Sequence, residues 1–386
     1  MNPSEWRTVN PTGKYRVLVT KELPGERWLE ILTRADCRVD ILTSPAIQSV
    51  AAIKAAMGST CSAAIGQLTE AWGDELFTAL KSAGGKAYSN YAVGFDNIDV
   101  EAATRNAIPV GNTPGVLTET TAEMAVALTF AAARRIGESE RYLRGGRYHG
   151  WLPTLFMGEL LQGKTVGIIG AGRIGDAYAR MMVAGHRMNL VYLDIYRNAS
   201  LEAYVAAYAD FLEQQDLPRV TCQKVDHVEE LLSQADVVSI HTILDTSTHH
   251  LINTRSLSLM KPDAVLVNTS RGPVIDETAL VEHCRQHPGF RAGLDVFEEE
   301  PNLKPGLEDL ENVVITPHIA SATSWTRQGM ATLAASNIAA ILTGYPVWQG
   351  TDILPFLDAS PPPAAPSILN AGELGLPIYT GGSDII

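Results

Sequence analysis

The sequence has few cysteines, and none of them pair at a metal-binding or redox spacing. There are four in 386 residues: Cys37, Cys61, Cys222 and Cys284. The absence of a Cys-x-x-Cys motif and of an apolar leader argues against a disulfide-stabilised secreted fold and indicates a reducing compartment. His283 and His287 have the spacing of a helical metal pair, but no third ligand lies nearby. We therefore predict no metal site.

Long apolar runs and excess positive charge are also missing. The longest apolar stretch, 122–133, falls short of the ~20 residues that span a bilayer and contains Glu123, so it predicts a buried helix. Lys and Arg total 30 against 43 Asp and Glu, a net charge of −13, which argues against a general nucleic-acid binder. With 46% hydrophobic and 19% charged residues, the chain has the composition of a folded protein of about two domains.

Short apolar strands alternate with helical stretches along most of the chain. In the first third the expected strands are 15–20, 38–42, 63–66 and 86–89, and a long helix is expected over 117–135. In the second part they are 165–169, 190–193, 237–240, 264–267, 293–297 and 313–315. This alternation predicts an α/β protein with doubly wound parallel sheets. The stretch 196–215 predicts an inserted helix without assigned chemistry, and the Pro-rich stretch 361–366 predicts an extended, poorly packed segment.

A glycine-rich turn marks a dinucleotide site. Gly170, Gly172 and Gly175 follow the strand 166–169 directly and precede a helical run. The first glycine permits a tight turn, the second lets a pyrophosphate approach the backbone, and the third lets helix and strand pack closely. Asp194 follows 19 residues after Gly175, where a carboxylate accepts hydrogen bonds from the ribose of NAD and repels the extra phosphate of NADP. NADH is therefore expected, and Arg197 nearby softens this preference.

Two later stretches carry groups suited to reducing a 2-oxo acid. Arg271 follows a strand and offers a fork that fits a carboxylate. His318 can give the proton that accompanies hydride transfer, and a carboxylate beside it favours the imidazolium. Each residue has a simpler interpretation. Arg271 could pair with Asp276, Glu300 could belong to a solvated acidic run, and His318 could be an ordinary loop histidine.

The chain resembles the D-isomer-specific 2-hydroxyacid dehydrogenases, and within them the plant-type hydroxypyruvate reductases. The resemblance covers roughly residues 10 to 350. It is carried by the segments 66–70, 90–97, 111–123, 170–175, 270–276, 293–301 and 317–321. It implies that a Rossmann dinucleotide-binding domain, 126–319, is inserted into a flavodoxin-like substrate-binding domain formed by 1–125 and 320–386.

The resemblance also implies roles for individual residues. Arg271, Glu300 and His318 match the family's catalytic residues, and Asp295 matches its nicotinamide-contacting Asp. Further cofactor contacts are expected from Arg173, Ile174, Thr269 and Ser270. Substrate contacts are expected from Leu68, Val93 and Gly94 together with Arg271.

These matches predict NADH-dependent reduction of hydroxypyruvate to D-glycerate, and of glyoxylate to glycolate, in a photorespiratory-type glycolate pathway. D-lactate dehydrogenase, 3-phosphoglycerate dehydrogenase and a non-enzymatic NADH-sensing protein are the alternatives. The sequence leaves open the preference between hydroxypyruvate and glyoxylate, and the extent of NADPH use.

Family members are usually homodimers that pair through an extended arm, here 142–161. Trp151, Leu152 and Phe156 are candidate anchors of that interface, with packing inside the chain as the alternative. A small 2-oxo acid is the expected partner molecule, with no nucleic acid or membrane. The expected location is intracellular, either cytosol or an organelle of glycolate metabolism such as the peroxisome or mitochondrion. The chain ends Ser383-Asp-Ile-Ile386 rather than in the peroxisomal Ser-Lys-Leu.

Overall fold

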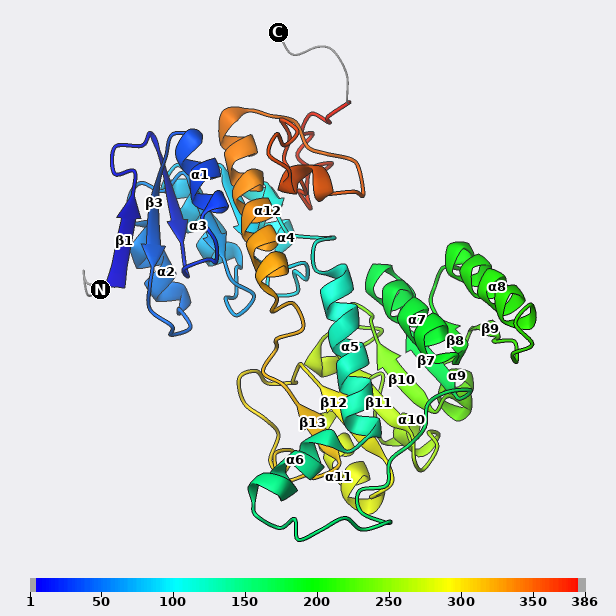
Figure 1. Ribbon diagram of the computed structural model, residues 1–386. Coiled ribbons are helices and arrows are strands. Elements are labelled where there is room, and N and C mark those ends of the chain that lie inside the picture. Colours follow the sequence, from blue (N-terminus) through cyan, green and yellow to red (C-terminus); the bar gives the residue numbers. More distant parts are fainter. Residues whose placement is uncertain (1–4, 381–386) are drawn as a thin grey trace. The chain divides into compact units, whose positions relative to one another are not determined.

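The computed structural model describes residues 5–380, which form two compact units (Figure 1). Unit 1 combines Met1–Leu117 with Ala322–Ile386, and unit 2 is Thr118–Ser321. The chain leaves unit 1 once and returns once, so unit 2 is an insertion within it. Each unit has its own sheet and its own core. The C-terminal residues 383–386 lie outside the described part.

The sheet of unit 1 has the strand order β1-β3-β2-β4-β5-β6. Its strands are β1 (Trp6–Val9), β2 (Tyr15–Val19), β3 (Cys37–Leu42), β4 (Ala63–Gly66), β5 (Ala87–Asn90) and β6 (Val110–Gly111). Strands β2 to β6 pair in parallel in the flavodoxin-like order, whereas β1 is an antiparallel edge strand with Trp6 opposite Leu42. The predicted parallel sheet is therefore confirmed, and β1, which was not predicted, adds an antiparallel edge.

Helices cover both faces of this sheet. They are α1 (Arg27–Arg34), α2 (Val50–Met57), α3 (Asp74–Ser82), α4 (Val100–Arg105) and α12 (Ser324–Thr343). Leu18, Ala64 and Tyr88 on the strands share one apolar core with α2, α3 and α4. Helices α1 and α12 pack on each other and on β3, β4 and β5 (Figure 1). Burial of the strands on both faces explains their near-continuous apolar sequences.

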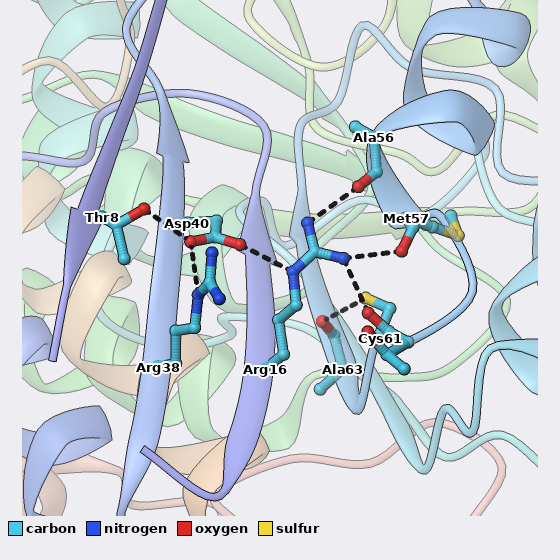
Figure 2. Close-up of polar contacts among 9 residues, drawn as sticks. Thr8, Arg16, Arg38, Asp40, Ala56, Met57, Cys61 and Ala63 are labelled. Carbon is cyan, nitrogen blue, oxygen red and sulfur yellow. Dashed lines mark hydrogen bonds and ion pairs between the residues drawn. The ribbon is translucent and has the colours of Figure 1, made fainter. Parts of the chain in front are cut away.

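A charged network joins the edge of this sheet to helix α2 (Figure 2). The Asp40 carboxylate accepts hydrogen bonds from Arg16 Nε at 2.6 Å, Arg38 Nε at 3.0 Å and Thr8 Oγ1 at 2.8 Å. The Arg16 guanidinium also donates to the carbonyls of Ala56 and of Met57 at the end of α2. Burial would raise the pKa of Asp40, but the hydrogen bonds from Arg16, Thr8 and Arg38 outweigh it and lower the pKa.

The sheet of unit 2 is fully parallel, in the order β13-β12-β11-β10-β7-β8-β9. Its strands are β7 (Thr165–Ile169), β8 (Asn189–Leu193), β9 (Cys222–Val225), β10 (Val237–Ile240), β11 (Val265–Asn268), β12 (Arg291–Leu294) and β13 (Val313–Ile315). The order reverses between β7 and β10, which is the switch point where a doubly wound sheet binds ligands. The predicted doubly wound fold is confirmed.

Two helical layers enclose this sheet. The helices are α5 (Thr118–Ala133), α6 (Ile136–Arg144), α7 (Arg173–His186), α8 (Ala199–Glu213), α9 (Val228–Gln234), α10 (Thr254–Ser258) and α11 (Glu277–Gln286). Val166 and Ile168 of β7 share a core with α5, α7 and α8, whereas Ile169 shares another with α9, α10 and α11. Successive strand residues thus point into opposite layers. No helix in the described residues combines the length and apolarity needed to cross a bilayer.

Some sequence expectations differ from the observed elements. Strand β9 was missed because its sequence, Cys-Gln-Lys-Val, is half polar, as suits an edge strand. Strand β12 ends at Leu294, three residues before the predicted end, so that 295–297 belong to a loop. The Pro-rich tail is better packed than predicted. Ala364 and Ala365 are buried beside α12, where the Ser367 amide donates to Asn337 Oδ1 at 2.9 Å.

Candidate active site

The predicted reacting groups of unit 2 lie on loops at the carboxyl ends of three adjacent strands. Arg271 follows β11, Glu300 follows β12 and His318 follows β13. Because parallel strands end at one edge of the sheet, residues almost fifty positions apart in the sequence come together there.

His318 and Glu300 form a direct hydrogen-bonded pair. Nδ1 of His318 lies 2.8 Å from Oε2 of Glu300, and the other carboxylate oxygen accepts the Phe297 amide at 3.0 Å. Burial would raise the pKa of Glu300. The hydrogen bond and charge of His318, the Phe297 amide and the charge of Arg271 act in the opposite direction, and together they lower it. Glu300 is therefore an ionised partner that holds the imidazole ring and leaves Nε2 available for proton transfer.

Asp295 fixes the loop that carries His318. Its fully buried carboxylate accepts hydrogen bonds from Thr316 Oγ1 at 2.6 Å, from the Ile319 amide at 2.8 Å and from the Ala320 amide at 2.7 Å. Its carbonyl accepts the His318 amide at 2.9 Å. His318 has a positive φ of 52°, a backbone strain that these bonds hold in place. The resemblance implied a nicotinamide contact for Asp295, and the structure adds this positioning role.

Asn268 and Gly272 position Arg271. The buried Asn268 side chain accepts from the amide and the hydroxyl of Ser270 and donates to the Arg271 carbonyl at 2.8 Å. A Cβ on Gly272 would lie 1.9 Å from the backbone of Phe297, so only glycine lets the loops after β11 and β12 approach this closely. Sequence reasoning missed both residues. An Asn at a strand end and the Arg-Gly-Pro turn were the available signals.

The glycine turn has the geometry of a phosphate cradle at the start of α7. Gly170 has φ of +94°, and a Cβ on Gly175 would lie 2.0 Å from the Gly170 carbonyl oxygen. A Cβ on Gly172 would meet nothing within 4 Å, so space is open in front of the first turn of α7. Free amides and the helix dipole make such a position favourable for a pyrophosphate.

A cavity of about 640 Å³ opens beside this turn. It is lined by Thr118, Glu119, Ala171, Gly172, Arg173, Asp176, Ala177, Arg180, Met181, Asn198 and Ser200. Among the predicted cofactor residues, Gly172 and Arg173 line it, and Ile174 is half-buried next to them. Asp194 follows β8 and accepts the Ala171 amide at 2.7 Å and the Tyr196 amide at 2.9 Å.

Unpartnered buried groups near the switch point fit a bound nucleotide. Among the described residues, Thr269 Oγ1 and His241 Nδ1 are buried without a hydrogen-bond partner. Leaving such a group unsatisfied costs about 1–3 kcal/mol. Burial lowers the pKa of His241 to about 3, so its ring is neutral. A bound NAD fits these residues, because it can offer hydrogen-bond partners to the unpartnered groups and place its pyrophosphate in the open space at Gly172.

The predicted substrate contacts belong to unit 1. Leu68 follows β4, and Val93 and Gly94 follow β5, at the carboxyl edge of that sheet. Asn112 Nδ2 donates to the Val93 carbonyl at 2.8 Å, and Asn90 Nδ2 donates to the Gly94 carbonyl at 3.0 Å. These two asparagines, which sequence reasoning missed, fix the backbone of the loop.

Sequence reasoning also missed a buried acidic residue, Glu277, which contacts the acidic run 298–300. Glu277, which is 1% exposed, accepts the Glu298 amide at 2.7 Å through Oε1. Oε2 has no hydrogen-bond partner among the described residues. Burial, reinforced by the charge of Glu298, raises the pKa of Glu277 to about 7. Glu298 in turn contacts His250 Nε2 at 3.0 Å. Nothing in the local sequence signals this burial, because Glu277 occupies an ordinary first turn of a helix.

No cluster of metal-binding side chains occurs within the described residues. His283 and His287 stack on each other with ring centroids 4.1 Å apart, and both are half-buried. His283 also packs edge-on against the buried Phe290.

Comparison with known proteins agrees with this geometry. Residues 126–320 match the family model of the D-isomer specific 2-hydroxyacid dehydrogenase NAD-binding domain. The chain is 57% identical to glycerate dehydrogenase of Cucumis sativus over 97% of its own length and 99% of the relative's. It is 56% identical to the protein named peroxisomal glycerate dehydrogenase HPR of Arabidopsis thaliana, over 97% and 98% of the two chains.

A solved structure with bound ligands shares the fold. The NADPH-dependent glyoxylate/hydroxypyruvate reductase of Sinorhizobium meliloti, in complex with NADP and malonate, superposes with a TM-score of 0.69. It is 31% identical, over 85% of this chain and 93% of that one. With the two-sheet fold, the nucleotide cradle and the histidine–glutamate pair, these similarities show that the chain belongs to the D-isomer specific 2-hydroxyacid dehydrogenases and is an NAD-dependent oxidoreductase.

Proposed function

We propose that this enzyme uses NADH to reduce hydroxypyruvate to D-glycerate and, less effectively, glyoxylate to glycolate, as in a photorespiratory-type glycolate pathway. The observation that carries the proposal is the His318–Glu300 pair, 2.8 Å apart, at the sheet edge that also presents Arg271. The names of the plant relatives support D-glycerate as the product, and the name of the Sinorhizobium protein supports both 2-oxo acids.

In this mechanism each of the three residues has one task. Arg271 binds the substrate carboxylate through its guanidinium fork. His318 protonates the carbonyl oxygen from Nε2 as that oxygen gains negative charge, and Glu300 stabilises the imidazolium through Nδ1. Bound NADH supplies the hydride. The balance is one 2-oxo acid, one NADH and one proton giving one 2-hydroxy acid and NAD⁺.

The nucleotide is held by the glycine turn and its neighbours. We assign the pyrophosphate to the amides at Gly172, Arg173 and Ile174, and the adenosine ribose to Asp194. Thr269 and Ser270, after β11, complete the cofactor contacts. Leu68, Val93 and Gly94 of unit 1 remain the proposed substrate contacts. Val93→Pro would test this by raising KM for hydroxypyruvate while leaving NADH binding unchanged.

A substrate panel read by NADH absorbance tests the function. We expect kcat/KM to be highest for hydroxypyruvate, lower for glyoxylate, and much lower for pyruvate and 3-phosphohydroxypyruvate. The highest value for pyruvate or for the phosphorylated acid would identify one of the alternative dehydrogenases. NADH binding without turnover of any 2-oxo acid would identify an NADH-sensing protein instead.

We propose that two copies pair through the arm that follows α6. Trp151 is 78% exposed, and Leu152, Met157 and Leu160 are also exposed, which is unusual for large apolar side chains in a lone subunit. Phe156, by contrast, packs inside the chain against Tyr142. Sedimentation should give twice the chain mass for the parent, and Trp151→Glu with Leu152→Glu should give a monomer. A monomeric parent would contradict the proposal.

We propose an intracellular location, either in the cytosol or in an organelle of glycolate metabolism. The Arabidopsis relative is named peroxisomal. Imaging of a fluorescent fusion that leaves the C-terminus free would distinguish a peroxisome or mitochondrion from the cytosol, and secretion would contradict the proposal.

A further inference from the structure

Helix α8 has no part in the chemistry described so far, yet it begins beside the nucleotide cradle. Its N-cap, Asn198, donates through Nδ2 to the Ala171 carbonyl at 2.9 Å and to Asp176 Oδ1 at 3.1 Å. Asn198 and Ser200 both line the cavity next to the glycine turn. The start of α8 is therefore attached to the cradle, four residues after Asp194.

Arg197 lies in the short loop between Asp194 and α8. A guanidinium near the acid that follows the second strand is the group that accommodates the 2′-phosphate of NADP in dinucleotide-binding folds. In this structure two of its nitrogens already bind a carboxylate. Nε and Nη2 donate to Oε2 of Glu202 at 2.8 and 2.6 Å.

The Glu202 carboxylate is itself held by a buried residue of β8. Its Oε1 accepts the hydroxyl of Tyr192 at 2.6 Å, and that hydroxyl also accepts the Asn198 amide at 3.1 Å. Tyr192 is fully buried on β8. Burial, followed by the hydrogen bond to Glu202, raises the pKa of Tyr192 to about 12, so the phenol stays a donor at neutral pH. The Glu202 side chain is 22% exposed, whereas that of Arg197 is 72% exposed.

The geometry therefore pairs an exposed cation with a carboxylate that Tyr192 holds in place. We propose that Glu202 is a cofactor-selectivity residue: it holds Arg197 away from the ribose and so reinforces the discrimination of Asp194 against NADPH. Helix α8 is then more than an insertion, because its first turn supplies the carboxylate. This inference rests on the nucleotide-dependent function proposed above, and it concerns the binding of NADPH rather than the reduction step.

The test is the dissociation constants of NADPH and NADH, measured by nucleotide fluorescence without substrate. Glu202→Gln frees Arg197, and we expect the NADPH constant to fall by about tenfold while the NADH constant changes by less than about twofold. That size corresponds to one charge-assisted hydrogen bond at a partly exposed site. The gain should shrink as salt is raised.

A double variant separates capture of the phosphate from simple relief of repulsion. Glu202→Gln with Arg197→Gln also lacks the carboxylate, but it has no cation to bind the phosphate, and we expect its NADPH constant to return close to the parental value. The same gain in the double variant as in Glu202→Gln, or no gain in Glu202→Gln, would overturn the proposal.

Glu213→Gln is the matched control, because Glu213 lies on the same helix and also pairs with an arginine, Arg219. It should leave both constants unchanged. Equal melting temperatures of parent and variants exclude misfolding as a cause. A parent that binds both nucleotides but reduces no 2-oxo acid would contradict the proposed function and leave this inference open to the same binding test.

Discussion

The buried carboxyl of Glu277 makes the stability of unit 2 depend on pH in a direction that one substitution can reveal. The group is 1% exposed, and its pKa is raised from 4.5 to about 7 by burial and by the nearby Glu298. The charge of Lys304 and the hydrogen bond to the Glu298 amide oppose that rise. We predict that Glu277→Gln, which keeps the shape and cannot ionise, removes this dependence.

The sign follows from the two states of the chain. Below about pH 4.5 the carboxyl is protonated in both the folded and the unfolded protein, and ionisation of Glu277 does not lower the free energy of unfolding. Between pH 4.5 and 7 the unfolded chain ionises while the folded chain holds the proton, so the free energy of unfolding falls. Above about pH 7 the carboxyl is ionised in both states, and the free energy of unfolding falls no further.

The size follows from the same pKa values. At about 1.4 kcal/mol for each pKa unit, a rise from 4.5 to about 7 corresponds to a loss on the order of 3 kcal/mol. We expect Glu277→Gln to be more stable than the parent by about 2–3 kcal/mol at pH 8 and equally stable at pH 4.5.

The assay is urea unfolding followed by far-ultraviolet circular dichroism from pH 4.5 to 8. Tryptophan fluorescence reports mainly on the unfolding of unit 1, because Trp151 is the sole tryptophan outside that unit. It therefore serves as an internal reference for the unit that lacks Glu277. Glu282→Gln, on the exposed side of the same helix, is the control and should not alter the pH dependence. Parallel stability curves for the parent and Glu277→Gln would refute the argument that the folded protein holds this proton.

Four further predictions concern activity and unit 1. Arg271→Lys should lower kcat/KM for hydroxypyruvate by about 10- to 100-fold with unchanged NADH binding, because one charge-assisted hydrogen bond is lost; parental kinetics would contradict the clamp. Asp194→Ser should raise the ratio of NADPH to NADH use, and an unchanged ratio would remove the acid as selector. His318→Ala should reduce turnover by about 10²–10⁴-fold while still binding NADH by fluorescence. Asp40→Asn should lower the free energy of unfolding by roughly 2 kcal/mol at pH 7. Because the pKa of Asp40 is lowered in the folded state, this contribution is complete above about pH 4 and should decrease as the pH falls from there through the lowered pKa; urea titrations at pH 7 and pH 3 would check this decrease.

Much of the fold follows from the sequence because its strands are short, apolar and buried on both faces. Strands β4, β7, β10 and β13 coincide residue for residue with the predicted ones. The glycine turn was equally readable, since Gly170 and Gly175 are demanded by local backbone geometry that no other residue satisfies. Family and cofactor class followed from these motifs, and the comparisons confirm both.

The tertiary structure alone decided features that depend on what packs against a residue. The antiparallel β1 and the polar edge strand β9 take their conformation from a neighbouring strand, not from their own sequence. The burial and the partners of charged side chains also depend on the tertiary structure. Glu277 is ordinary in sequence and buried in space. Arg197 was predicted to soften the preference for NADH, whereas the fold pairs it with Glu202. A side chain's partner and its exposure to water are set by residues distant in the chain, and local sequence carries no record of them.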